Sequence, residues 1–379
     1  MTFVSDPLLI RQVVAHPLRA VLPTVQRTSQ GDWPALEIVV VELRTESGLV
    51  GIGECLARRG AAGYARFITD ALAPKLIGRS AHDRRALWAA MRGVLTGRGG
   101  GMLVEAIAGL NIALWDLAGK AAGQPVWRLL GGIGRGRVDA YASSVNWADQ
   151  GRMEAELEAA LARGFRQVKL KVGRPVREAT AWARRARQIA GPEVALYVDA
   201  NWIYDADDAL RVGRVLADED YGWFEEPLPP DDHAGYRRLA QHLPIRLAAG
   251  ESDFLAHQSA ALVADHVLGL VQPDVARSGG ITETWRIAEH AALHNVAYAP
   301  HIGWSGAICA AASLHLAAAA ESFMTFECMV FDNPLRQALC APLEGDVARL
   351  EEGQLVVPDR PGLGIDLLPD ALERMRIKE

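Results

Sequence analysis

Residues 168–172 read Val-Lys-Leu-Lys-Val, a short apolar run with an ionisable residue near its end. Six similar runs, each followed by an ionisable residue, occur further along the chain. The ionisable residues that close them stand 28, 26, 26, 23, 27 and 26 positions apart, and they are Lys171, Asp199, Glu225, Glu251, Asp274, His301 and Glu327. Such an interval accommodates one strand, one loop, one helix and a return loop. The repeat therefore predicts an α/β fold, a barrel of alternating parallel strands and helices. Because all strand ends share one face, the charges should meet at one mouth.

Length and composition are those of a globular enzyme. The 379 residues can hold a barrel of about 200–250 residues and a smaller unit. Half of the residues are hydrophobic and 23% are charged, and the net charge of −6 gives no reason to expect nucleic acid or a membrane as a partner. The four cysteines form no CxxC pair, and no signal peptide precedes the first strand, so we expect reduced thiols and a cytoplasmic location.

Three parts are expected: a cap at residues 1–130, a barrel at 131–330 and a tail at 331–379. The cap contains two β-rich runs joined through Ser47-Gly48, which is a hairpin signal. Helical stretches follow at about 64–77, 83–95 and 103–121, so the cap should be a small α+β unit. The tail has several prolines and no strand–helix rhythm, and we expect it to return to the cap.

Asp199, Glu225 and Glu251 close three successive runs, and three carboxylates at one barrel mouth repel one another. A hard divalent cation removes this repulsion, and Mg²⁺ suits three carboxylates with positions left for water or substrate. For any one acid alone, a salt bridge or a helix cap is an equal alternative. Three acids in register favour the metal. Glu226 should point to the opposite face of its strand, because side chains alternate.

Lys169 and Lys171 lie two residues apart, so both should face the barrel interior. Two neighbouring ammonium groups lower each other's pKa, and a metal nearby lowers it further. A lysine whose pKa is lowered in this way can act as a general base near neutral pH. The alternative is a pair of lysines on a solvated strand edge.

Asp274 and His301 close consecutive runs, so they should be neighbours around the barrel. An aspartate that holds one imidazole nitrogen fixes the tautomer and raises the basicity of the ring, which suits acid–base work. An ordinary buried ion pair is the alternative. Glu327 closes the last run, and it could hydrogen-bond a developing oxyanion if its pKa were raised. It could equally be a structural acid.

The charged residues sit within short motifs. These are Lys169-x-Lys171, Val198-Asp199-Ala200-Asn201, Phe224-Glu225-Glu226-Pro227, Gly250-Glu251, Gln272-Pro273-Asp274 followed by Gly279-Gly280, and Pro300-His301. As a set they resemble the enolase superfamily and, within it, the mandelate racemase subgroup, over essentially the whole chain. Asp274 favours this subgroup, because the muconate-lactonising branch has a lysine as its second base on that side.

The resemblance implies a modified (β/α)7β barrel of the TIM type under an α+β capping domain, and a homo-oligomer. It also implies one Mg²⁺ per subunit, held by Asp199, Glu225 and Glu251, and removal of the proton α to a substrate carboxylate through an enediolate. By the same resemblance the remaining residues have these roles: Lys171 is the base on one face, His301 with Asp274 acts on the other, Glu327 hydrogen-bonds the enolic carboxylate, and Asn201 and Lys169 support it.

The leading functional hypothesis is an acid-sugar dehydratase that converts an aldonate or aldarate into a 2-keto-3-deoxy acid. Polar residues of the cap loops are available for hydroxyls or a second carboxylate of such a small-molecule substrate: His16, Arg19, Arg58 and Arg59. Ordinary solvated loop residues are the alternative for these four.

Two other classes of function stay open. The same residues could serve an isomerase, either a racemase or epimerase, or a cycloisomerase of sugar lactones. The segments Glu54-Cys55-Leu56 and Asn333-Pro334-Leu335-Arg336-Gln337 look somewhat like the cycloisomerase branch. A non-catalytic protein that binds sugar acids is a third hypothesis, and the intact set of base, acidic residues and Asp–His pair argues against it.

Overall fold

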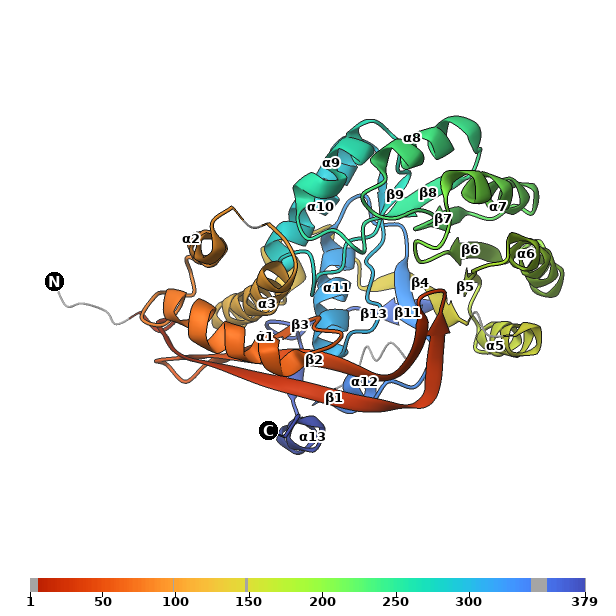
Figure 1. Cartoon of the computed structure of the whole chain (residues 1–379). Coiled ribbons are helices and arrows are strands. Elements are labelled where there is room, and N and C mark those ends of the chain that lie inside the picture. The colour runs from red at the N-terminus through yellow and green to blue at the C-terminus, as the bar shows by residue number, and fades with distance from the viewer. Residues whose placement is uncertain (1–5, 98, 147–148, 342–352, 379) are drawn as a thin grey trace.

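The computed structural model describes residues 6–97, 99–146, 149–341 and 353–378 (Figure 1). Over these residues eight parallel strands form one curled sheet, in the order β10-β9-β8-β7-β6-β5-β4-β11. Their bounds are β4 (Arg137–Val145), β5 (Gln167–Lys171), β6 (Ala195–Asp199), β7 (Trp223–Glu225), β8 (Arg246–Ala249), β9 (Leu270–Val271), β10 (Ala297–Tyr298) and β11 (Phe326–Met329).

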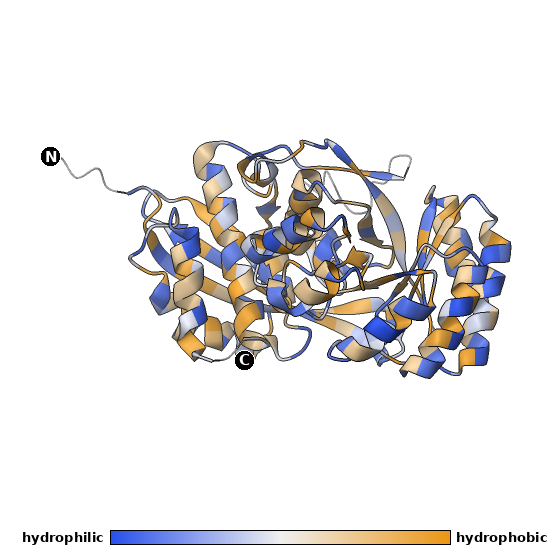
Figure 2. Ribbon diagram, turned by 90° about the horizontal axis from the view of Figure 1, so that it is seen from above, coloured by the Kyte–Doolittle hydropathy of each residue, from blue (hydrophilic) through white to orange (hydrophobic). Residues whose placement is uncertain are grey.

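Seven helices connect these strands in the described chain, one after each strand from β4 to β10. They are α5 (Gln150–Ala162), α6 (Val176–Ala190), α7 (Ala206–Asp218), α8 (His233–His242), α9 (Ala256–Ala264), α10 (Ile281–Leu293) and α11 (Ala307–Ala319). Aspartate side chains accept backbone N–H bonds at three helix starts, which satisfies donors that have no partner within the helix: Asp149 at α5, Asp205 at α7 and Asp232 at α8. Figure 2 shows hydrophobic and hydrophilic residues alternating along these outer helices, which cover the barrel with one face.

The sheet closes into a barrel. Strand β11 pairs in parallel with β4, and β10 meets the segment before β11 through the bridge between Tyr298 and Phe323. Around that bridge the Tyr298 amide donates to the Ser322 carbonyl at 2.9 Å, and the Met324 amide donates to the Tyr298 carbonyl at 2.8 Å. Eight strands with seven connecting helices confirm the expected (β/α)7β barrel.

The barrel interior is filled by aromatic side chains below the strand ends. Tyr197 and Trp223 stack with ring centroids 3.4 Å apart, and Tyr141 meets both edge-on. All three are buried. The next residues toward the strand ends are charged, and register aligns them, because Lys171 pairs with Asp199 and Asp199 pairs with Glu225 across β5, β6 and β7. The sheet therefore places these charges side by side on an apolar floor.

The cap begins with an antiparallel sheet of β1 (Ile10–Thr28), β2 (Gly31–Thr45) and β3 (Val50–Cys55). Helices α1 (Ala61–Phe67), α2 (Arg84–Arg92) and α3 (Met102–Ala122) follow, and short π and 3₁₀ turns extend α1 to Lys75. Helix α3 is long and apolar enough to cross a membrane, but 83% of its most apolar window is buried in the protein, so it is a core helix. The expected α+β cap is confirmed.

The hairpin of β1 and β2 reaches from the cap to the barrel (Figure 1). At its tip the Arg27 amide donates to Asn146 Oδ1 at 2.9 Å, and Ser29 Oγ donates to the Ala200 carbonyl at 2.9 Å. Gln30 Nε2 donates to the next carbonyl, that of Asn201, at 2.6 Å. The tip therefore lies over the end of β6, where the charged residues begin.

Residues after β11 contact both cap and barrel. They form α12 (Pro334–Gln337), β12 (Cys340–Ala341), β13 (Gln354–Val356), β14 (Asp366–Leu367) and α13 (Pro369–Met375). Strand β13 pairs with β4, while the Leu363 amide donates to Asp116 Oδ1 of α3 at 2.9 Å. The Ile377 amide donates to the Pro17 carbonyl of β1 at 2.9 Å. The boundaries of the three parts at 130 and 330 stay predictions.

Close packing of β3 on α3 depends on glycine, and it yields a first prediction. A Cβ atom at Gly53 would lie 1.9 Å from the Gly109 carbonyl oxygen, so Gly53→Ala has to push the helix away and should destabilise the protein by about 1–3 kcal/mol. Gly63 in α1 has nothing within 4 Å of such an atom, so Gly63→Ala should be neutral or stabilising by up to about 1 kcal/mol. Thermal denaturation measures both, and equal midpoints would contradict the packing described.

Candidate active site

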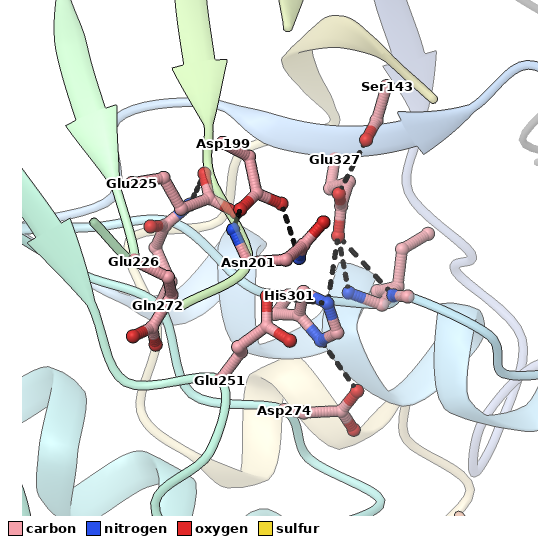
Figure 3. Close-up of polar contacts among 12 residues, drawn as sticks. Ser143, Asp199, Asn201, Glu225, Glu226, Glu251, Gln272, Asp274, His301 and Glu327 are labelled. Carbon is pink, nitrogen blue, oxygen red and sulfur yellow. Dashed lines mark hydrogen bonds and ion pairs between the residues drawn. The ribbon is translucent and has the colours of Figure 1, made fainter. Parts of the chain in front are cut away.

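Three buried carboxylates lie together at the mouth of the barrel (Figure 3). Asp199 ends β6, Glu225 ends β7, and Glu251 follows β8 after one glycine. One oxygen atom from each lies within 4.8 Å of the other two. Glu251 Oε2 is buried and makes no hydrogen bond in the described chain, although His301 Nε2 lies 3.3 Å from it. A set of three carboxylate oxygens fits a hard divalent cation such as Mg²⁺.

Two lysines of β5 partly neutralise this cluster. Lys171 forms an ion pair with Asp199, and Lys169 Nζ lies 2.5 Å from Glu225 Oε1 and 3.0 Å from Glu327 Oε1. Both side chains face the interior, as alternation predicts. The expectation of a lowered pKa is wrong for Lys169: burial would lower its pKa, but Glu225 and Glu327 outweigh this and raise that pKa well above its usual range. The carboxylates nearby outnumber the ammonium groups.

The acids of the cluster differ in charge state. Burial raises the pKa of Glu225 to about 7, although Lys169 opposes the rise. Burial would also raise the pKa of Asp199, but Lys171 and Lys169 outweigh it and lower that pKa. Protonation of Glu225 near neutral pH therefore relieves part of the repulsion, and a bound cation would relieve the rest.

Neutral side chains orient the carboxylates, and sequence reasoning missed two of them. Gln272 Nε2 donates to Glu225 Oε2 at 2.8 Å, and Trp223 Nε1 donates to the same oxygen at 3.0 Å. Trp223 precedes Glu225 by two residues, so alternation along β7 was the signal that could have found it. Asn201, already expected near the site, donates to Asp199 from its amide nitrogen at 2.8 Å and from Nδ2 at 3.1 Å.

His301 joins the acidic cluster to Asp274. His301 Nδ1 lies 2.9 Å from Asp274 Oδ2, and Nε2 lies 3.3 Å from Glu251 Oε2. The expected pairing of Asp274 with His301 is thus present in the structure. Burial would lower the pKa of His301, but Glu251, Glu327 and Asp274 outweigh it and raise that pKa to about 9. In this arrangement the imidazole is protonated at neutral pH.

Glu327 accepts hydrogen bonds from three directions. Ser143 Oγ donates to Oε1 at 2.7 Å, and the backbone amides of Ile302 and Gly303 donate to Oε2 at 2.8 and 3.3 Å. Burial would raise the pKa of Glu327, but Lys169 and His301 outweigh it and lower that pKa. The condition of a raised pKa is therefore not met in this arrangement of side chains, in which Glu327 is an ionised acceptor.

The loop after β10, which supplies those two amides, is held by residues far away in the sequence. Arg336 Nη2 and Asn333 Nδ2 each donate to the Ser305 carbonyl at 2.9 Å. From the other side Glu54 Oε1 accepts the Gly306 amide at 2.6 Å, and burial raises the pKa of Glu54 to about 7. The segments Glu54-Cys55-Leu56 and Asn333-Pro334-Leu335-Arg336-Gln337, which are far apart in the sequence, thus both contact this loop beside the site.

Of the cap residues expected to contact substrate, the structure places Arg58 beside the carboxylate cluster but not His16 or Arg19. Arg58 Nη2 lies 3.8 Å from Glu251 Oε1. His16 instead lies 2.8 Å from Glu42, in a cavity lined by residues of the cap and by residues of the tail between 366 and 376. Arg19 is largely exposed and lies 3.9 Å from Glu37 on the cap sheet. A substrate contact is therefore not supported for His16 or Arg19. Both residues belong to the long strand β1, and the sequence pattern did not show which residues surround them there.

Comparison with known proteins places the chain in a family. The family described as mandelate racemase/muconate lactonizing enzyme, N-terminal domain, matches residues 10–131, and the family described as enolase C-terminal domain-like matches residues 152–371. The chain belongs to the mandelate racemase/muconate lactonizing enzyme group of the enolase superfamily. The Mg²⁺ cofactor expected from the sequence is that of this superfamily, and Asp199, Glu225 and Glu251 can hold it.

Individual members of the superfamily resemble the whole chain. D-galactarolactone cycloisomerase of Agrobacterium fabrum is 34% identical over 90% of this chain and 92% of its own length. Arabinonate dehydratase of Saccharolobus solfataricus is 31% identical over 90% of this chain and 91% of its own length. The crystal structure of a racemase from Streptomyces coelicolor with bound magnesium has a TM-score of 0.89, with 30% identity over 97% of this chain and 100% of that one. Subunit number and cellular compartment stay predictions.

The carboxylate cluster predicts a matched pair of metal-binding results. Glu251→Gln removes one charge and one ligand, so Mg²⁺ should bind about 100-fold more weakly. Glu154→Gln is the control, because Glu154 lies on the outer helix α5 and pairs with Arg185 at 2.9 Å, away from the three carboxylates. Titration calorimetry measures both affinities. Unchanged affinity in Glu251→Gln would remove Glu251 from the metal site.

The raised pKa of His301 predicts a titration result. In protein treated with a chelator, His301 should titrate near pH 9 instead of near 6.5. Asp274→Asn should lower that pKa by about one to three units, since a carboxylate 2.9 Å away favours the charged imidazole. NMR of ¹⁵N-labelled histidine follows the ring directly, with the spectrum of His301→Gln for assignment. A midpoint near 6.5 in the unmodified protein would show that the neighbouring acids do not act on the ring.

Proposed function

We propose that the protein is a Mg²⁺-dependent dehydratase of acid sugars, which removes the proton α to a carboxylate and expels the β-hydroxyl to give a 2-keto-3-deoxy acid. The observation that carries the proposal is the placement of a lysine and a protonated histidine on either side of one acidic cluster. Lys171 contacts Asp199, and His301 lies 3.3 Å from Glu251. Relatives named as acid-sugar dehydratases and cycloisomerases support the same substrate class.

Lys171 would accept the α-proton. It can do so only as a neutral amine, so its ion pair with Asp199 has to open before catalysis. Opening is favourable when Asp199 serves as a metal ligand, because the carboxylate then has another cation as its partner. Bound Mg²⁺ would neutralise the substrate carboxylate and the second negative charge that develops on it when the α-proton leaves. The chain contributes the amine, its alignment on β5 and a site shielded from water.

His301 would supply the proton that the leaving hydroxyl needs. The C–O bond at the β-carbon breaks, the oxygen takes the bonding electrons and the imidazolium proton, and water leaves. The enol that remains becomes the 2-keto acid by proton transfer to carbon. The acids around the ring keep His301 protonated up to a pKa of about 9, which suits a general acid at neutral pH.

A cycloisomerase is the second candidate, and one specific observation favours it. Glu54, Asn333 and Arg336 come from the two segments that look like that branch, and they meet on the loop after β10. In this reaction Lys171 and His301 keep their roles, but the group that leaves the β-carbon is a ring oxygen, which takes the proton from His301. The product then forms without loss of water.

Variants of the two acid–base residues separate the steps. Lys171→Met should abolish both product formation and exchange of the α-proton with deuterated solvent, with a loss of at least about 10²–10⁴-fold. His301→Gln should retain exchange but form no keto acid, because the leaving group lacks its proton. ¹H NMR of a panel of aldonates, aldarates and their lactones follows exchange, water loss and ring opening together. Exchange that persists unchanged in Lys171→Met would refute the assignment of the base.

A further inference from the structure

Two guanidinium groups lie beside the acidic cluster, where the cap meets the barrel. Arg58 belongs to the turn after β3, and Arg277 belongs to the loop after β9. Their side chains are 20% and 15% exposed, so they border an opening instead of filling the core. The guanidinium of Arg277 lies 4.5 Å from the ring centroid of Phe254, and the Leu56 amide donates to the Ala276 carbonyl at 3.2 Å, so the two segments that carry the arginines lie side by side. The two cations are therefore neighbours.

Several of their donors lack a partner. Nε and Nη2 of Arg58 and Nε of Arg277 are buried and make no hydrogen bond in the described chain. A buried donor without an acceptor is destabilising, and more so when it is charged. Arg187 shows the contrasting structural pattern, because its Nε, Nη1 and Nη2 all donate to backbone carbonyls. Unpaired donors next to a reaction centre point to an acceptor that arrives with a ligand.

The backbone at Arg58 is held in an unfavourable conformation. Its φ of 53° lies in the left-handed region, which is unfavourable for a residue with a long side chain. Arg59, the next residue, takes the ordinary surface position over the ring of Trp33. The strained turn thus directs Arg58 toward Glu251 and leaves Arg59 outside, and strain of this kind persists where a ligand contact requires it.

Acids close to the two guanidinium groups also have other partners. Glu251 is assigned to the metal cluster, Asp274 pairs with His301, and Glu105, 3.6 Å from Arg277 Nη1, accepts a hydrogen bond from the Tyr64 hydroxyl at 2.6 Å. The charge of Arg277 also acts on Asp253. Donors of both arginines nevertheless have no acceptor in the described chain, so a further anion can bind them, and the planar donor fork of arginine matches a carboxylate.

The two oxygens of Glu251 indicate how a substrate would extend from the acidic cluster to the two arginines. Its Oε2 faces His301 at 3.3 Å, and its Oε1 faces Arg58 at 3.8 Å. A chain whose first carboxylate lies at the acidic cluster and whose leaving oxygen faces His301 would therefore continue toward Arg58. We propose that Arg58 and Arg277 bind the second carboxylate of a diacid, so that the substrate is an aldarate and not an aldonate. This inference rests on the proposed function, which places the first carboxylate.

A comparison of two acids tests the inference. A six-carbon aldarate and the aldonate of the same configuration differ only at C6, which is a carboxylate in one and a hydroxymethyl group in the other. The unmodified protein with Mg²⁺ should prefer the aldarate at least about tenfold in kcat/KM, since a charged hydrogen-bonded pair contributes that much. Arg58→Met and Arg277→Met should each reduce this preference, by lowering kcat/KM for the aldarate at least about tenfold while the aldonate changes less than about threefold.

The control variant is Arg66→Met, which removes an exposed arginine of α1 that pairs with Asp70. It should keep the full preference. Binding of both acids, measured by calorimetry in Lys171→Met so that no turnover occurs, gives a second readout with the same expected order. Equal kcat/KM or Kd for the two acids, a preference unchanged in both arginine variants, or no binding of either acid would overturn the inference.

The two proposals fail in different ways. If the aldarate binds at least tenfold more tightly than the aldonate but neither acid exchanges its α-proton, the proposed reaction is wrong and the carboxylate site stands. If both acids react equally well, the reaction stands and the carboxylate site is wrong. Raising the ionic strength should weaken the preference for the aldarate, because a partly exposed ion pair is screened by salt.

Discussion

The mutual repulsion of Asp199, Glu225 and Glu251 is the constraint on which the site depends. Two unit charges 4 Å apart repel by about 4 kcal/mol at an effective dielectric constant of 20. The pairing of β6 with β7 fixes Asp199 opposite Glu225, so the chain cannot separate these acids without breaking the barrel. Lys169 and Lys171 relieve the repulsion in part. A divalent cation at the same oxygens relieves it more fully, and this is why the fold favours a metal-dependent enzyme.

The rest of the molecule keeps these charges aligned and shielded from water. The aromatic floor of Tyr141, Tyr197 and Trp223 fills the barrel below them, and the tip of the cap hairpin lies over the end of β6. The loop after β10 is held from two sides by Glu54 and Arg336, so its amides stay directed at the last strand. In such a setting a lysine and a histidine that contact the same acidic cluster can hold opposite roles, one as base and one as acid.

Periodicity was enough to predict the barrel and the residues at its strand ends, because parallel strands of one barrel necessarily end together. The same periodicity predicted that Asp274 and His301 are neighbours. The pKa of Lys169 was predicted in the wrong direction, because a pKa depends on every charge nearby and not only on the partner two residues away. The surroundings of His16 could not be predicted for a related reason, since cap residues such as Glu42 and residues of the tail form them together.

A crystal structure with Mn²⁺ in place of Mg²⁺ tests the central claim most directly, because the anomalous signal of manganese locates the ion without ambiguity. The account predicts one peak among the carboxylate oxygens of Asp199, Glu225 and Glu251, with Lys171 no longer paired to Asp199. A peak elsewhere, or three carboxylates that coordinate no ion at saturating Mn²⁺, would contradict it.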